Sequence, residues 1–266
     1  MARVNAAMSA AVLCLVSVQL ACAQSASPYA RAVSSELSIS AGVAQSERRD
    51  LAASPLNFGG RGGDLLLGYA RERGRTLLQL SLGGGLRTLA SSTSAVASTE
   101  RLTETELHAA ALRHVDGRAG NADGLSIGAS FDANVTFTAH SYRDASQRVS
   151  EFVLGVATLG PVANWKRTIG SGALSAQLGV PIAGFVQHSY SPLNAQYALT
   201  NSRLVTIGAL RGSSGALSYA SFNSARFSPV YLYRFAVMRY DDVQQVRALT
   251  QSLSVGMVAR FGPQAQ

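Results

Sequence analysis

The stretch LSIGASFDANVTFTAH, residues 125–140, alternates apolar with small or polar side chains over sixteen positions. A period of two is the pattern of a β-strand whose two faces meet different surroundings. A strand in a soluble sheet usually runs about 3–10 residues, whereas a tilted strand that crosses a membrane needs about 9–11. The apolar side consists of Leu125, Ile127, Ala129, Phe131, Ala133, Val135, Phe137 and Ala139.

The N-terminus has the organisation of a secretory signal. Arg3 precedes an apolar run over residues 6–18, and small residues at 21–23 frame a cleavage position before Gln24. The run is shorter than the roughly 20 apolar residues of a membrane-spanning helix. We therefore expect a signal peptide over residues 1–23, followed by one β-domain over residues 24–266.

A lipoprotein signal is the alternative, with Cys22 acylated after cleavage. Gln19 stands where such signals usually carry leucine. Cys14 and Cys22, the two cysteines of the chain, both lie in the segment to be removed. The predicted mature protein then has no disulfide, and no zinc-like Cys/His spacing is present. We expect no metal and no cofactor.

The chain is basic, with 23 Lys and Arg against 15 Asp and Glu, and Lys166 is the one lysine. Export argues against nucleic acid as the partner of this charge. Outer-membrane lipid and the phosphate groups of lipopolysaccharide suit arginines better. Surface charge that only keeps the protein soluble is the other interpretation.

Eleven alternating segments follow the signal, separated by turns rich in Gly, Ser, Asn and Asp. Bacterial single-chain barrels close with an even number of strands, so we expect twelve, with ten as the alternative. The polar stretches 46–63 and 189–201 read as loops. Pro181 predicts a strand end or a bulge, because proline cannot donate to a sheet.

Small residues at the positions that alternate with the apolar ones favour a closed barrel over a soluble sandwich. A narrow lumen requires small side chains there, whereas a water-facing side would be rich in Lys and Glu, and lysine is nearly absent. The residues in question are Gly83, Gly85, Gly128, Ser130, Ser252, Ser254 and Gly256.

The last segment, ALTQSLSVGMVARF, is amphipathic and ends on Phe261. In this respect the sequence resembles the Gram-negative outer-membrane β-barrel superfamily. The resemblance implies a closed antiparallel up-and-down transmembrane β-barrel in the outer membrane, with Phe261 read by the barrel-assembly machinery. Two features depart from the pattern: GPQAQ follows Phe261, and Trp165 is the single tryptophan. A soluble periplasmic β-protein is the alternative.

Several polar residues are expected to meet inside the barrel. Glu104, Glu106 and His108 share one strand face, Asp132 and Asn134 share the polar face of the next strand, and Arg87 should arrive near Glu104. Acidic groups this close together repel unless cations neutralise them. We interpret the set as a lumenal polar network that plugs and stiffens the barrel, with general acid–base chemistry as the alternative.

No catalytic residue is assigned from the sequence. Barrel-type lipases and lipid A deacylases carry a His-x-Ser motif, which His140-Ser141 and His188-Ser189 do not match. We therefore expect a structural, surface-interaction or limited passive-pore role. A lipid-modifying hydrolase is the alternative, and the sequence leaves the oligomeric state open.

Overall fold

A computed structural model describes residues 33–50, 56–91, 98–115, 123–142, 148–192, 199–221, 227–241 and 245–261. The expected signal peptide, residues 1–23, lies outside these ranges. Twelve β-strands make up most of the described chain: β1 (Val33–Asp50), β2 (Phe58–Arg73), β3 (Thr76–Ser91), β4 (Ser98–His114), β5 (Gly124–Tyr142), β6 (Arg148–Ile169), β7 (Gly172–Gly179), β8 (Ala183–Pro192), β9 (Leu199–Thr206), β10 (Leu210–Ser221), β11 (Phe227–Tyr240) and β12 (Val246–Phe261).

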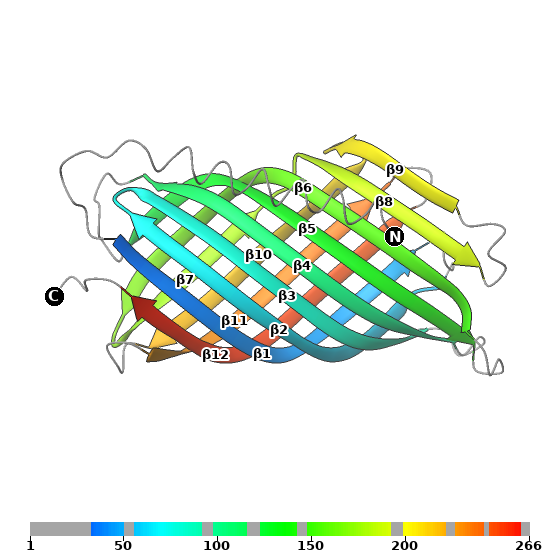
Figure 1. Cartoon of the computed structure of the whole chain (residues 1–266), viewed down its shortest axis with the longest axis horizontal. Coiled ribbons are helices and arrows are strands. Elements are labelled where there is room, and N and C mark those ends of the chain that lie inside the picture. Colours follow the sequence, from blue (N-terminus) through cyan, green and yellow to red (C-terminus); the bar gives the residue numbers. More distant parts are fainter. Residues whose placement is uncertain are drawn as a thin grey trace. The chain divides into compact units, whose positions relative to one another are not determined.

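Ten of these strands close into a barrel, in which every neighbouring pair is antiparallel (Figure 1). The order around the ring is β1 to β7, then β10, β11 and β12, and β12 pairs with β1 over sixteen residues from Ser35–Phe261 to Asp50–Val246. The expected all-β, antiparallel, closed barrel is confirmed. The chain has the twelve strands favoured by the sequence, while the ring has the ten of the alternative.

Strands β8 and β9 lie outside the ring and form a hairpin that continues one wall, at the upper right of Figure 1. β6 pairs with β7 along its C-terminal half and with β8 along its N-terminal half. The interruption between β7 and β8 contains Pro181, so the strand end predicted there is confirmed. A second interruption, residues 207–209, separates β9 from β10.

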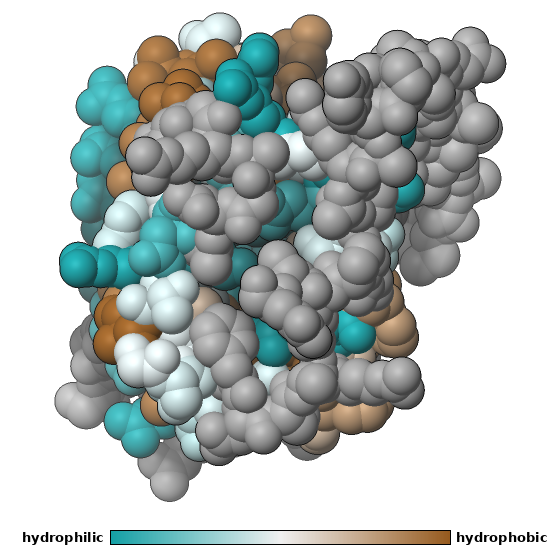
Figure 2. Space-filling view, turned by 90° about the vertical axis from the view of Figure 1, so that its left-hand side faces the viewer, coloured by the Kyte–Doolittle hydropathy of each residue, from teal (hydrophilic) through white to brown (hydrophobic). Residues whose placement is uncertain are grey.

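The two faces of the barrel wall differ as the alternation predicts. On β5, Ile127 is 52% exposed and Phe137 is 48% exposed, whereas Ser126 and Thr138 on the other parity are each 3% exposed. The apolar side chains therefore cover the outside, and the small and polar ones point inward. Viewed end-on, hydrophobic and hydrophilic residues both appear around the rim, and further hydrophilic residues appear near the middle (Figure 2).

The stretch 46–63, expected to be a loop, is largely strand. β1 continues to Asp50 and β2 already begins at Phe58. Glycine allows this on β2, because a Cβ at Gly60 or Gly62 would overlap a backbone carbonyl of β3. The expected loop 189–201 is also shorter than predicted, since β8 runs to Pro192 and β9 starts at Leu199.

Apolar side chains fill the lumen at the end where β1 finishes and β2 begins. One cluster comprises Leu154, Val156, Val186, Val205, Leu210, Tyr240 and Val246, and a second comprises Phe58, Leu89 and Leu102. The sequence predicted small and polar side chains inside the barrel, but at this end larger apolar side chains pack together there. Within the described ranges, no helix is long and apolar enough to cross a bilayer.

Candidate functional site

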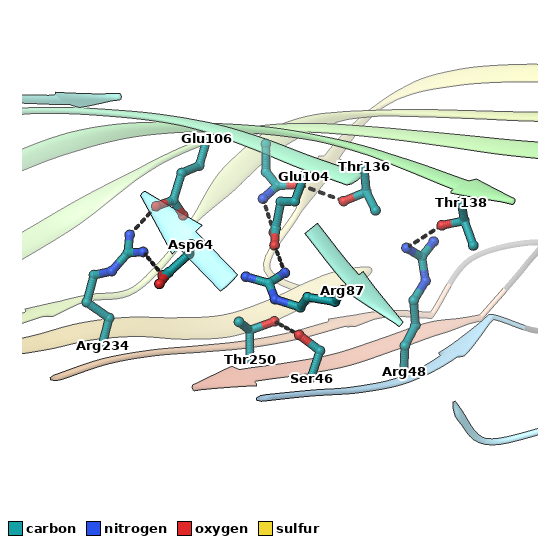
Figure 3. A network of polar contacts seen from close by, with 11 residues as sticks. Ser46, Arg48, Asp64, Arg87, Glu104, Glu106, Thr136, Thr138, Arg234 and Thr250 are labelled. Atoms are coloured by element: carbon teal, nitrogen blue, oxygen red, sulfur yellow. Dashed lines mark hydrogen bonds and ion pairs between the residues drawn. The ribbon is translucent and has the colours of Figure 1, made fainter. Parts of the chain in front are cut away.

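The lumen contains an ion-pair network, and its first group of residues comes from three strands. Arg87 of β3 donates through Nη1 to Glu104 of β4, and Asn134 of β5 donates its amide to the other oxygen of the same carboxylate. Thr136 Oγ1 donates to Asn134 Oδ1 over 2.9 Å. These contacts join three neighbouring strands from the inside (Figure 3).

A second group of residues reaches across the barrel. Arg234 of β11 donates through Nη2 to Asp64 Oδ2 of β2 over 2.7 Å and through Nη1 to Glu106 Oε1 of β4. In Figure 3 the Arg234 side chain rises from one wall and meets Glu106 from the other. The side chain of Asp64 is 3% exposed and that of Glu106 is 34% exposed. Arg234 therefore neutralises one buried carboxylate and one that is partly solvated.

His108 forms a separate group further along the lumen. Its Nδ1 lies 2.6 Å from Asp132 Oδ1, and its Nε2 lies 3.1 Å from the Gln177 amide nitrogen of β7. Ser130 Oγ donates to the other oxygen of Asp132 over 3.2 Å. The register places Asp132 directly opposite His108, and Glu106 opposite Asn134.

The six residues expected in the network all line one cavity, but they form three groups rather than one. Arg87, Glu104 and Asn134 contact one another, while His108 and Asp132 form a pair of their own. Glu106 bonds to Arg234, a residue that the sequence analysis missed. Arg234 stands at an inward-facing position of β11, FSPVYLYRFAVMRY, whose other inward-facing residues are mostly apolar. That contrast was the feature of the sequence that could have revealed it.

Buried charges also close the end of the lumen that carries the apolar clusters. Asp50 Oδ2 accepts from Arg48 and lies 3.1 Å from His188 Nε2 of β8. His140 Nδ1 lies 3.4 Å from Glu100 Oε1, and the His140 ring packs edge-on against Phe58. These charges are thus paired at the same end of the lumen as the apolar clusters.

The opposite end of the lumen holds a chain of three polar residues. Ser126 Oγ of β5 lies 2.8 Å from His114 Nδ1 of β4, and His114 Nε2 lies 3.2 Å from Glu72 Oε1 of β2. Nearby, Arg260 of β12 donates to Glu36 of β1 over 3.0 Å, across the seam that joins the first and last strands.

A cavity of about 590 Å³ runs inside the barrel. It is lined at one end by Glu36, Ser126 and Lys166, and at the other by Arg48 and Leu210. Among the described residues, no group of three or more His, Cys, Asp or Glu could hold a metal ion.

The outer surface carries a row of four arginines, one on each of four adjacent strands. Arg49 of β1 is paired in register with Arg247 of β12, Arg247 with Arg239 of β11, and Arg239 with Arg211 of β10. We call these four residues the arginine row. Each lies one position from the end of its strand, at the end of the barrel where the lumen is apolar.

The barrel resembles solved outer-membrane proteins in structure but hardly in sequence. It aligns with the outer membrane protease OmpT from Escherichia coli at a TM-score of 0.60, with 8% identity over 90% of this chain and 99% of that one. The chain has the fold of the outer-membrane β-barrels. At 8% identity, the likeness to OmpT shows the fold alone.

Two further matches superpose less well. The translocator domain of autotransporter NalP from Neisseria meningitidis gives a TM-score of 0.43, at 16% identity over 97% of this barrel and 96% of that one. Ail of Yersinia pestis gives a TM-score of 0.34, at 19% identity over 85% of this chain and 99% of that one. No protein-family model matches the chain, and no curated protein matches it in sequence.

Proposed function

We propose that the chain is an outer-membrane barrel, closed to free diffusion, that binds the phosphate groups of lipopolysaccharide at its outer rim. In this proposal residues 1–23 are a cleavable signal, and the barrel-assembly machinery inserts the mature chain. The arginine row carries the proposal, and the filled lumen supports a role in structure and surface interaction rather than in passage of solutes.

The four arginines of the row repel one another unless an anion lies between them. Directly opposed residues on neighbouring strands have Cβ atoms about 4.5–5.5 Å apart, and like charges at such positions repel. Asp241 forms an ion pair with Arg239, whose side chain is 46% exposed. A phosphate bound between guanidinium groups would offset the remaining repulsion, because arginine binds phosphate through two parallel N–H donors.

The position of the row suits a lipid headgroup. The two-residue turns at 74–75 and 170–171 lie at the opposite end of the barrel, and short turns are typical of the periplasmic side. On β1, twelve residues separate Arg49 from Leu37, which is 52% exposed. At the usual rise and tilt this is about 30 Å along the barrel axis, which places the row beyond the exposed apolar side chains of β1, the last of which is Val43.

The burial of inward-facing residues supports a closed lumen. A side chain that lines a water-filled channel is exposed to that water. Leu89 and Val246 are 0% exposed, and Phe152 and His140 are each 1% exposed, although all four face the interior. No channel wide enough for solvent therefore passes these side chains.

The lipid proposal is tested by thermal unfolding of the refolded barrel in detergent with added lipopolysaccharide. We expect lipopolysaccharide to raise the unfolding temperature of the wild type, since a ligand bound to the folded state stabilises it. The double variant Arg239→Gln, Arg247→Gln should lose this shift, while the control Arg71→Gln, Arg73→Gln at the other end should keep it. An equal shift with dephosphorylated lipopolysaccharide, or in the rim variant, would refute the proposal.

The closed lumen is tested by conductance across a planar bilayer. We expect silent insertion, with a gel mobility that changes on boiling to show that the barrel has folded. Discrete, reproducible current steps would show that the lumen is open and would favour a passive pore instead.

A further inference from the structure

We propose that Ser126, His114 and Glu72 form a serine esterase site at the periplasmic end of the lumen. Ser126 Oγ lies 2.8 Å from His114 Nδ1, and Glu72 Oε1 lies 3.2 Å from His114 Nε2. A nucleophile, a base and a carboxylate that orients the base are the three parts of such a site. Here Nδ1 faces the serine and Nε2 faces the carboxylate.

The strand register fixes these parts relative to one another. His114 and Ser126 are directly opposed on β4 and β5. Val115, which follows His114, donates its N–H to the carbonyl of Leu125, which precedes Ser126, over 2.9 Å. Glu72 comes from β2, two strands away. A hydrogen-bonded wall therefore holds the serine and the histidine at reacting distance before any substrate arrives.

The reaction that this geometry allows is ester hydrolysis through an acyl-enzyme. Ser126 Oγ attacks the ester carbonyl carbon and His114 Nδ1 takes the hydroxyl proton. The carbonyl–oxygen bond to the alcohol breaks, and His114 returns the proton to the leaving alkoxide. Water, deprotonated by His114, then releases the carboxylic acid and frees Ser126. Glu72 is a positioning residue that accepts the Nε2–H and stabilises the imidazolium.

Neighbouring residues define the class of ester. Asn164 is opposite Ser126 on β6, and its Oδ1 accepts from Ser175 over 3.0 Å, which leaves its amide N–H groups as donors on the face that Ser126 shares. Lys166, two residues further on β6, is diagonal to Ser126 and lines the same cavity. The site therefore fits a carboxylic ester that carries an anionic group such as a phosphate.

Access to the site is through the lumen. Ser126 is 3% exposed, but it lines the cavity of about 590 Å³ together with His114, Glu72 and Lys166. The ester must therefore reach Ser126 through this cavity.

The direct test is covalent labelling of the wild-type refolded barrel with a fluorophosphonate, followed by mass spectrometry of the labelled peptide. We expect one adduct, on Ser126, and its loss in Ser126→Ala. Ser130→Ala is the matched control, because Ser130 is buried on the same face of β5 and donates to Asp132 instead of to a histidine. A folded wild-type barrel without an adduct on Ser126 would overturn the proposal.

Kinetics give an independent readout with p-nitrophenyl butyrate as the probe. His114→Asn should lower kcat by about 100-fold or more, the usual contribution of a general base. Glu72→Gln should lower kcat and leave KM for the butyrate unchanged, because the carboxylate acts on His114 and not on the bound ester. Lys166→Gln should raise KM for a phosphate-bearing ester. Hydrolysis that persists in Ser126→Ala would refute the assignment.

Discussion

Replacement of Arg234 by glutamine should destabilise the barrel more than any exposed substitution. The change leaves the Asp64 carboxylate, 3% exposed, without its charged partner, while Ser254 Oγ still donates to Asp64 Oδ1 over 3.5 Å. Stranding one member of a buried ion pair costs about 3–5 kcal/mol. Because the Arg234 side chain is 21% exposed, lumenal water can solvate part of the charge, and we take the lower value of about 3 kcal/mol.

Glu106 adds little to this cost. Its side chain is 34% exposed, and an ion pair in contact with solvent is worth about 0–1 kcal/mol. Arg234→Gln should therefore lower the free energy of unfolding by about 3–4 kcal/mol. The assay is urea unfolding of the barrel in detergent, followed by the fluorescence of Trp165 and by gel mobility. Arg71→Gln, on the exposed face of β2, should stay within about 0.5 kcal/mol of wild type.

The double variant Arg234→Gln, Asp64→Asn decides whether a stranded charge is the cause. Two neutral amides can pair, so the second substitution should recover about 1–3 kcal/mol of the loss. If Arg234→Gln costs less than about 1 kcal/mol, or if Asp64→Asn worsens it, the ion pair across the lumen does not stabilise this barrel in the way described.

Three other predictions concern the turns, the glycines and the C-terminus. Gly62→Ala should destabilise by about 1–3 kcal/mol or prevent folding, because its Cβ would overlap β3, whereas Gly59→Ala, with 3.9 Å to its nearest neighbour, should fold normally on a gel-mobility assay. Hydrogen bonds from Thr168, first from its side chain and then from its backbone N–H, hold the pKa of Asp123 below its usual 3.8. The extra stability of wild type over Asp123→Asn should therefore be present above pH 3.8 and disappear as the pH falls through the lowered pKa, in unfolding curves at several pH values. Phe261→Ala should slow insertion by the assembly machinery in a reconstituted assay, and an unchanged rate would show that this aromatic is not read.

Alternation was enough to predict the fold class, because each strand repeats the same two environments. It could not predict the departure of β8 and β9 from the ring. Their sequences alternate like those of the other strands, and only the pairing of β10 with β7 rather than with β9 reveals the excursion.

The candidate sites were predictable where partners lie on adjacent strands. Glu104 and Arg87 could be placed together by counting from a turn. Arg234 and Asp64, 170 residues apart, meet only because the barrel closes, and no local pattern encodes that distance. His114 and Ser126 were within reach of the same counting, but no motif in the sequence singles them out.

The seam between β1 and β12 has a consequence for the order of folding. Its sixteen residue pairs, together with the Glu36–Arg260 ion pair, join residues that are 196 to 226 positions apart in the sequence. Contacts of such high sequence separation form late, because the entropy of closing a long loop is lost before they contribute. Until β12 arrives, the growing sheet has two open edges, which are templates for wrong pairing with other chains. A truncated chain without its last sixteen strand residues should thus aggregate even though every other pair of strands remains encoded.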